Sequence, residues 1–460
     1  MIEQKLPFWR RPAFTRCFLA PVSSAFLILA AFSPLNLRPL VFVALVPWLL
    51  AMPYATRKEA WRSGMAFNFV FALGQMYFVV PLATKVSGSL GMALIPWLAC
   101  LLIGLMYFGP MALVMNWCCR TERMWLIPLV WAGVEIWRSY MFVFAFPVGL
   151  IAEPLAAYPA IINSAWWLTI YGVGAWVVLG NLVVAALIQR RRPKPAIVVF
   201  AAVLASSVFL YIRPVTGTAR RIIMGQPGLD IAFSKQDRSN LVSGALIDRT
   251  LDIAEAEHAD LTVMPEGMIN LPTGQPVNLG FRPRADAPIV FGAQRGSHPK
   301  YQSAFSYDGH WEHADKTRLV IFGEFVPYRD VFPFLKAFDL PNADLTPGDK
   351  VTALHVGKLT VGSIICFEEM FPDVTYRQKA NGAQLLAIIS EDDWFRDTPE
   401  LGQLRDSCIF RAIETGMPVV RAATTGYSIA IDQRGRVIAS APVGPFAAVP
   451  VTVYVEDRRS

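Results

Sequence analysis

Long apolar runs between residues 17 and 213 constrain the fold more than any other feature of this sequence. Several of these runs approach the roughly 20 residues that a helix needs to cross a bilayer. Of the 460 residues, 54% are hydrophobic and 17% are charged, which is far from a typical soluble composition. Most acidic residues fall after residue 220, where the chain resembles an ordinary globular domain. We therefore predict a transmembrane helical domain over 1–213 and a separate globular domain over 220–450.

The apolar runs predict about seven transmembrane helices. They cover residues 17–34, 38–55, 64–83, 90–116, 124–145, 163–189 and 195–213. The second is the weakest, because Pro39, Pro47 and Pro53 interrupt it. The first could be a cleaved signal peptide, but no small-residue cleavage site followed by polar chain is evident, so we interpret it as a retained helix.

Lysine and arginine placement predicts the orientation of these helices. One set of alternate loops holds thirteen of these residues and the other set holds two, Arg38 and Lys85. The positive-inside rule then puts the N-terminus in the cytoplasm, and seven crossings put the globular domain outside. We expect a multi-pass protein of the bacterial inner membrane with that domain in the periplasm. The net charge of +7 reflects these loop clusters, so we expect no direct binding to nucleic acid.

Two charged residues, Glu135 and Arg138, fall within the fifth predicted span. Charges at membrane depth are costly and are often functional. The alternative is an ion pair on one helix face whose side chains reach the interface. The sequence leaves both interpretations open.

After residue 220 the hydrophobic pattern changes to short apolar runs that alternate with amphipathic segments. "RRIIMGQP", "DLTVMPEG", "LTVGSIICFEE" and "AQLLAIIS" predict buried strands, and 243–259, 371–382 and 402–416 predict helices. Such alternation indicates a layered α/β domain.

Three strand ends of this domain carry reactive groups: Glu266, Lys316 and Cys366. A cysteine nucleophile needs a base, and Glu266 can accept the thiol proton. Lys316 can hold the carboxylate and the oxyanion, and the backbone N–H of Phe367 can be a second oxyanion donor. Singly, each residue is more often structural. Together they suit acyl transfer from an amide, nitrile or ester carbonyl.

The quoted motifs resemble those of the carbon–nitrogen hydrolase (nitrilase) superfamily over about 220–445. The resemblance rests on "MPEGM", "DKTRLVIFGEFVP" and "IICFEEMFPD". Within the superfamily, "FGEFVP", "RAIETGMPVVRAATTG", "IDQRGRVIA" and the preceding spans look like apolipoprotein N-acyltransferase. The resemblance implies an αββα sandwich that takes an acyl chain from a phospholipid as a thioester and passes it to the amine of a lipoprotein.

The resemblance also implies a role for each matched residue. Glu266 would be the general base, Lys316 the oxyanion partner and Cys366 the nucleophile. Glu324 matches an additional glutamate that supports the lysine and the base, and Glu368 matches an acidic position after the cysteine. In "SEDDWF", Asp392, Trp394 and Phe395 match the corresponding stretch of the acyltransferase, and the resemblance implies that they line the substrate pocket.

Some positions depart from the acyltransferase pattern, among them Glu391 where asparagine is expected and Phe367 where tyrosine is expected. These departures motivate an alternative, the TraB-type conjugal-transfer proteins, whose nitrilase-like domain would serve a conjugation machinery. A periplasmic amidase acting on a soluble amide is a third interpretation.

Other motifs predict no cofactor and no metal site. His310 and His313 lie three residues apart near His298, but nothing in the sequence completes a zinc set. Cys366 and Cys408 both fall in the predicted periplasmic domain, so a disulfide between them is chemically permitted.

Overall fold

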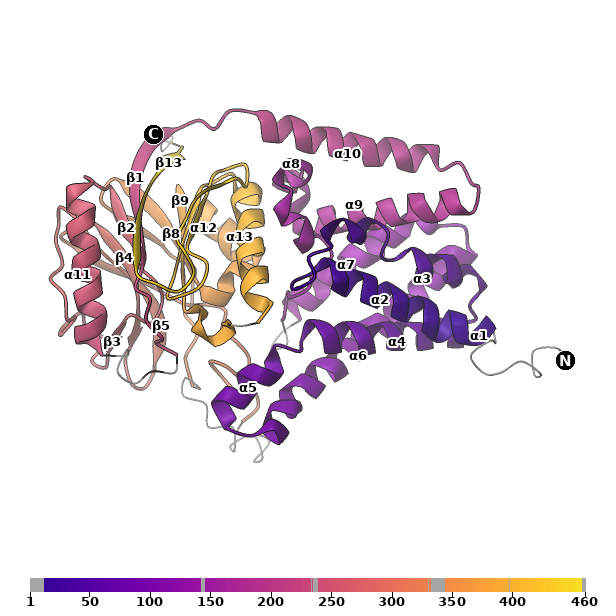
Figure 1. Ribbon diagram of the computed structural model, residues 1–460, viewed down its shortest axis with the longest axis horizontal. Coiled ribbons are helices and arrows are strands. Elements are labelled where there is room, and N and C mark those ends of the chain that lie inside the picture. The colour runs from indigo at the N-terminus through magenta and orange to yellow at the C-terminus, as the bar shows by residue number, and fades with distance from the viewer. Residues whose placement is uncertain are drawn as a thin grey trace. The chain divides into compact units, whose positions relative to one another are not determined.

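The computed structural model describes residues 12–141, 145–232, 234, 239–329, 331, 344–396 and 398–456 (Figure 1). The chain forms two compact units, Met1–Leu210 and Tyr211–Ser460. The first is helical and the second is a layered α/β unit, as the hydrophobic pattern predicts.

The helical unit consists of ten α-helices, counted over the described residues and with α10 running two residues past its boundary, and of shorter turns labelled η. They are α1 (Pro12–Phe14), η3 (Thr15–Leu19), α2 (Ala20–Ala31), η4 (Arg38–Phe42), α3 (Val46–Ala51), η5 (Met52–Tyr54), α4 (Arg57–Gln75), α5 (Val79–Ser87), α6 (Leu90–Arg120), η6 (Met124–Leu126), α7 (Ile127–Tyr140), η8 (Glu153–Ala157), α8 (Pro159–Ile162), α9 (Ala165–Ile188) and α10 (Lys194–Ile212).

The predicted number of seven spans is not confirmed. Within the described residues, four helices are long and apolar enough to cross a membrane: Pro12–Ala31, Leu90–Arg120, Ala165–Ile188 and Lys194–Ile212. A fifth crossing results if α4 and α5, which meet at a bend of 46°, form one broken span. These helices make the chain a membrane protein.

Two predicted spans fail for different physical reasons. Over 38–55, each of the three prolines lies at the start of a separate short helix. A backbone N–H at that position would have no partner within the helix, so its absence breaks no hydrogen bond. The run is thus cut into η4, α3 and η5. In the described part of the fifth predicted span, η6 leads into the 14 residues of α7, which ends at Tyr140. At 1.5 Å per residue, α7 alone covers roughly 20 Å of a hydrocarbon core of about 30 Å.

The charged pair of α7 anchors an irregular segment that follows the helix. The guanidinium of Arg138 donates to the carbonyls of Val148 and Gly149 at 2.6 and 2.8 Å. The carboxylate of Glu135 accepts the N–H of Ile151 at 2.8 Å. Both side chains are buried, so the structure does not support an ion pair that reaches the interface. Non-helical backbone at membrane depth needs such internal partners because lipid offers none.

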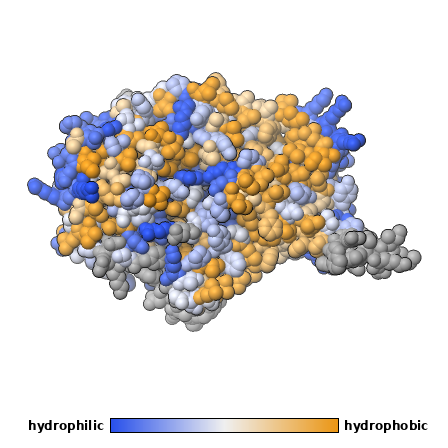
Figure 2. Space-filling model, in the orientation of Figure 1, coloured by the Kyte–Doolittle hydropathy of each residue, from blue (hydrophilic) through white to orange (hydrophobic). Residues whose placement is uncertain are grey.

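Apolar side chains cover much of the face of the helical unit that Figure 2 shows, whereas the α/β unit has a mixed surface. Large exposed apolar residues include Leu102 and Met106 of α6 and Val198 and Phe209 of α10. Exposed apolar surface of this extent is typical of helices that face lipid.

The α/β unit contains two sheets. The strands are β1 (Thr218–Gln226), β2 (Leu261–Val263), β3 (Ile269–Leu271), β4 (Ile289–Arg295), β5 (Tyr301–Tyr307), β6 (Trp311–Asp315), β7 (Ala353–Val356), β8 (Leu359–Ile365), β9 (Leu385–Ser390), β10 (Val419–Ala423), β11 (Ile429–Ile431), β12 (Val437–Ser440) and β13 (Ala447–Val455). One sheet has the order β13-β1-β2-β4-β5-β6, with β3 beside β4, and the other has the order β12-β11-β10-β9-β8-β7.

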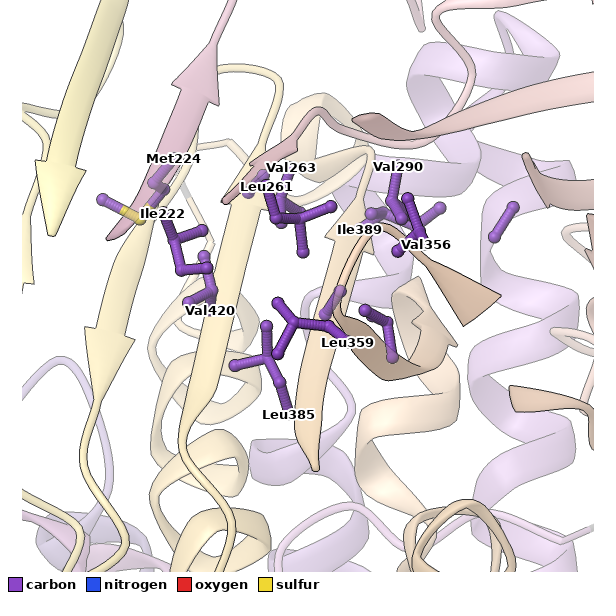
Figure 3. Close-up of a cluster of buried hydrophobic side chains, with 14 of the residues drawn as sticks. Ile222, Met224, Leu261, Val263, Val290, Val356, Leu359, Leu385, Ile389 and Val420 are labelled. Carbon is purple, nitrogen blue, oxygen red and sulfur yellow. The ribbon is translucent and has the colours of Figure 1, made fainter. Parts of the chain in front are cut away.

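The two sheets bury their inner faces against each other. Figure 3 shows Ile222 and Val263 of the first sheet pointing toward Leu385 and Val420 of the second. Helix α11 (Asn240–Ala256) packs on the outer face of the first sheet, and α12 (Pro372–Ala380) and α13 (Glu400–Thr415) pack on that of the second. These four layers agree with the αββα sandwich that the resemblance implies.

Candidate active site

Glu266 lies three residues beyond the end of β2, and its carboxylate is buried. One carboxylate oxygen, Oε2, accepts the backbone N–H of Glu391 at 3.2 Å. Gly292 of β4 permits this placement, because a Cβ at that position would come within 2.3 Å of Glu266 Cα. The neighbouring parallel strand thus determines where the carboxylate sits.

Lys316 follows β6, and its ammonium lies between two carboxylates. Nζ is 3.2 Å from Oε1 of Glu266 and 2.5 Å from Oε1 of Glu324. The Lys316 side chain is 0% exposed. The second oxygen of Glu324 accepts the N–H of Val320 at 2.9 Å, which fixes this carboxylate in its own loop. The structure therefore brings Glu266, Lys316 and Glu324 together.

Cys366 begins the turn that follows β8, and the five residues of this turn, Cys366–Met370, form a 3-10 helix. Its φ of +52° lies in the left-handed region, which costs a residue with a side chain about 1–2 kcal/mol. A strained residue of this kind persists only where its surroundings hold it, and such residues cluster at functional sites. The thiol is buried and lies within the electrostatic reach of Glu266, Lys316 and Glu324.

Burial raises the pKa of the Cys366 thiol well above its usual value, the negative charge of Glu266 raises it further, and Lys316 opposes both effects. Burial also raises the pKa of Glu266, although Lys316 opposes this. Burial acts to lower the pKa of Lys316, but the carboxylates of Glu266 and Glu324 outweigh it and hold that pKa well above its usual value. The resting site thus holds a neutral thiol beside a carboxylate of raised basicity.

Glu368 joins the cysteine turn to the lysine segment. Oε2 accepts the N–H of Ile365 at 3.0 Å, and Oε1 accepts the N–H and the hydroxyl of Thr317 at 2.7 and 2.8 Å. Phe367 is buried, and its ring packs edge-on against Phe371. The predicted supporting residues therefore lie beside the reactive groups, with Glu368 as the physical link between two of them.

The three residues predicted to line the pocket lie on one 3-10 turn, Asp392–Phe395, with different surroundings. Asp392 is fully enclosed in a pair with Arg421, whose Nη1 is 2.7 Å from Oδ2. Trp394 is partly buried and Phe395 is buried. The structure gives Asp392 a structural partner that the sequence pattern did not reveal.

The pattern analysis missed Arg421 and Glu369, which form a buried ion pair at 2.9 Å. A signal existed in each case: Arg421 interrupts the apolar strand "MPVVRAATT", and Glu369 directly follows another acid. A charge in a buried strand requires a buried partner.

The sequence also draws attention to three histidines, His298, His310 and His313, and to Cys408. No group of three or more His, Cys, Asp or Glu residues in the described part of the chain could hold a metal ion. Cys366 and Cys408 are both free and buried, and the thiol of Cys408 donates to Glu369 at 3.0 Å.

Comparison with known proteins first defines the class of the α/β unit and then the family of the whole chain. Residues 304–448 match the carbon-nitrogen hydrolase family, so this unit is a carbon-nitrogen hydrolase domain. Residues 24–183 match the apolipoprotein N-acyltransferase N-terminal domain. The chain, which combines both, belongs to the apolipoprotein N-acyltransferase family.

Similar proteins span most of the chain. An apolipoprotein N-acyltransferase of Geobacter metallireducens is 26% identical over 93% of this chain and 87% of its own length. One from Haemophilus influenzae is 24% identical over 92% and 86%. Among solved structures, an amidase from Nesterenkonia sp. AN1 covers 50% of this chain and 92% of its own at 18% identity, with a TM-score of 0.38. The conjugal-transfer interpretation is not favoured by these relatives.

Proposed function

We propose that this protein is a membrane N-acyltransferase that moves an acyl chain from a phospholipid through a thioester on Cys366 to the N-terminal amine of a lipoprotein. The observation that carries the proposal is the fully buried ammonium of Lys316, paired with Glu266 and Glu324, beside a cysteine on a strained turn. This set occurs in a chain that also carries membrane-spanning helices.

In the first half-reaction, Glu266 takes the proton from the Cys366 thiol, and the thiolate attacks the carbonyl carbon of a phospholipid ester. The tetrahedral oxyanion forms near the ammonium of Lys316 and the backbone N–H of Phe367, which stabilise the developing charge. The ester C–O bond then breaks, and Glu266 returns the proton to the leaving alkoxide. The products are a lysophospholipid and an acyl thioester on Cys366.

In the second half-reaction, the free amine of the acceptor attacks the thioester carbonyl and Glu266 takes a proton from it. The C–S bond breaks, an amide forms, and the thiol of Cys366 is restored when it recovers that proton. Lys316 keeps Glu266 oriented toward both substrates, because its ammonium is held on the far side by Glu324.

The setting of the reaction is also part of the proposal. We place the protein in the bacterial inner membrane with the carbon-nitrogen hydrolase domain in the periplasm, where a lipid acyl donor and a lipoprotein acceptor would both be present. This orientation follows from the seven-span arrangement predicted from the hydrophobic pattern, in which one set of alternate loops holds most of the lysine and arginine residues.

Thioester capture tests the proposal. The full-length protein in detergent micelles is incubated with a phospholipid that carries a fluorescent label in its acyl chains, and the protein is then denatured and treated with hydroxylamine. Label should appear on Cys366 and be released by hydroxylamine. Cys366→Ala is the control, since it keeps the other five of the six cysteines. A wild-type protein that stays unlabelled, or label that persists in Cys366→Ala, would refute the proposal.

A further inference from the structure

The turn that carries Cys366 is held from two sides by consecutive glutamates. Glu368 faces the lysine segment and accepts from Ile365 and Thr317. Glu369 faces the opposite way and accepts two parallel hydrogen bonds from Arg421, each 2.9 Å long. These contacts restrain the turn, and an unfavourable φ such as that of Cys366 persists only where the surrounding structure holds it.

Arg421 also holds a second segment, the one that follows β9. Its Nη1 and Nη2 donate to the two carboxylate oxygens of Asp392 at 2.7 and 2.9 Å, and Nη2 donates to the hydroxyl of Ser390 at 3.1 Å. The hydroxyl of Ser390 in turn donates to Asp392 at 2.7 Å. The parallel pairing of β9 and β10, which places Ser390 opposite Ala423, brings these groups to one end of the sheet.

The segment after β9 is the one that orients Glu266. The N–H of Glu391, between Ser390 and Asp392, donates to Oε2 of Glu266 at 3.2 Å. Arg421 therefore joins the turn of the thiol to the segment that holds the carboxylate. It does so through Glu369 and Asp392, without itself touching either reactive group in any contact that the structure describes.

The chemistry of this link is specific to arginine. Arg421, Glu369 and Asp392 are all 0% exposed in their side chains, so the guanidinium has no water to replace a lost partner. A planar guanidinium can bind two carboxylates through two parallel pairs of hydrogen bonds, whereas an ammonium is a point donor that cannot.

We propose that Arg421 is a positioning residue that sets the separation of the Cys366 thiol from the Glu266 carboxylate by clamping Glu369 and Asp392 in one arrangement. This proposal rests on the acyl-transfer function proposed above. A displacement of about 1 Å between reacting groups can lower a rate by about 10²-fold. The expected loss is therefore in the rate of thioester formation and not in phospholipid binding.

The test compares Arg421→Lys with Arg411→Lys in the full-length protein. Arg411 is an equally buried arginine that pairs at 2.8 Å with Glu414 on its own helix, α13. Arg421→Lys should lower the first-order rate of thioester formation about 10²-fold and change the KM for labelled phospholipid less than about 2-fold. Arg411→Lys should lose a similar amount of thermal stability and keep its rate within about 3-fold of wild type.

Two further measurements separate this proposal from the proposed function. Iodoacetamide alkylation of Cys366 as a function of pH, mapped by peptide analysis, needs no lipid. The profile should move to higher pH in Arg421→Lys because the thiol loses its aligned base. Glu369→Gln, which removes one carboxylate and keeps the size of the side chain, should show the same shift to a smaller extent. If Arg421→Lys does not fold, the alkylation profile of Glu369→Gln tests the proposal in its place.

The outcomes are distinct. A wild-type protein that forms no thioester while the alkylation profile still shifts would refute the acyl-transfer function and support the clamp. A thioester rate and an alkylation profile that are unchanged in Arg421→Lys would refute the clamp and leave the function standing. Equal loss of rate in Arg421→Lys and Arg411→Lys would also refute it, because the effect would then follow general destabilisation.

Discussion

Replacing Lys316 with methionine tests the electrostatics of the site most directly. The substitution keeps the length of the side chain but removes the ammonium that lies 3.2 Å from Glu266 and 2.5 Å from Glu324. The two carboxylates would then face each other without a counter-charge in a buried site. Removing one partner of a buried ion pair costs roughly 3–5 kcal/mol. For a unit of this size, that corresponds to a fall in Tm of roughly 6–20 °C.

The loss should depend on pH in a defined direction. The pKa of Glu266 is already raised in the folded protein and should rise further without Lys316. A raised carboxyl pKa makes the folded state less stable as pH increases above the unfolded value of 4.5. The stability deficit of Lys316→Met should therefore be largest near neutral pH and shrink as pH falls toward 4.5, where the Glu266 carboxylate takes up a proton.

Thermal unfolding in detergent at several pH values, together with thioester formation, measures both effects. Lys316→Met should acylate at least about 10³-fold more slowly, because it loses an oxyanion donor and the group that orients the base. The double variant Lys316→Met/Glu324→Gln should recover stability but no activity, since it removes one of the two negative charges that repel each other.

Lys379→Met is the control. Lys379 donates to the carbonyl of Thr415 outside the site, so its loss should cost about 1 kcal/mol at all pH values. A deficit that does not vary with pH, or a double variant no more stable than the single one, would refute this reasoning.

Three further predictions address other parts of the molecule. Gly292→Ala should lower the rate of thioester formation at least about 10²-fold, because the added methyl would sit 2.3 Å from Glu266 Cα and displace that residue; a rate within 3-fold of wild type would contradict the assigned role of Gly292. Glu400→Gln should stabilise the protein increasingly between pH 4.5 and 8, by roughly 5 kcal/mol at most, because burial and Glu369 raise the pKa of Glu400 to about 8; equal Tm differences at pH 5 and 8 would count against this. Arg138→Met should lower the Tm of the full-length protein and increase trypsin or chymotrypsin cleavage within 145–158, since two buried carbonyls lose their donor; an unchanged digestion pattern would show that the segment is held by other contacts.

The strand-end positions of the reactive groups could be predicted because they depend on local pattern. Glu266 and Cys366 each follow a short buried strand whose apolar residues are contiguous in the sequence. The ends of such strands project from a sheet whatever the rest of the fold does. The layered α/β architecture follows from the same alternation of strands and helices, and the membrane half follows from apolar runs near bilayer length.

The number of crossings could not be predicted from hydropathy alone. A window average cannot distinguish a continuous helix from the proline-separated pieces of 38–55, which have similar composition. It also cannot detect that α7 ends at Tyr140, since the residues that follow are equally apolar. The described backbone from 145 to 152 is not helical, and Glu135 and Arg138 supply some of the hydrogen bonds that a helix would otherwise make internally.

By itself, then, the sequence determined which residues carry reactive groups, because chemical identity and strand periodicity are local properties. Only the tertiary structure decided how those groups are held. Arg421 lies 29 residues after Asp392 and 52 after Glu369, and no local rule joins them. The parallel pairing of β9 with β10 and the burial of the Cys366 turn bring the three together, because a charge enclosed in a core is stable only where its partners are enclosed with it.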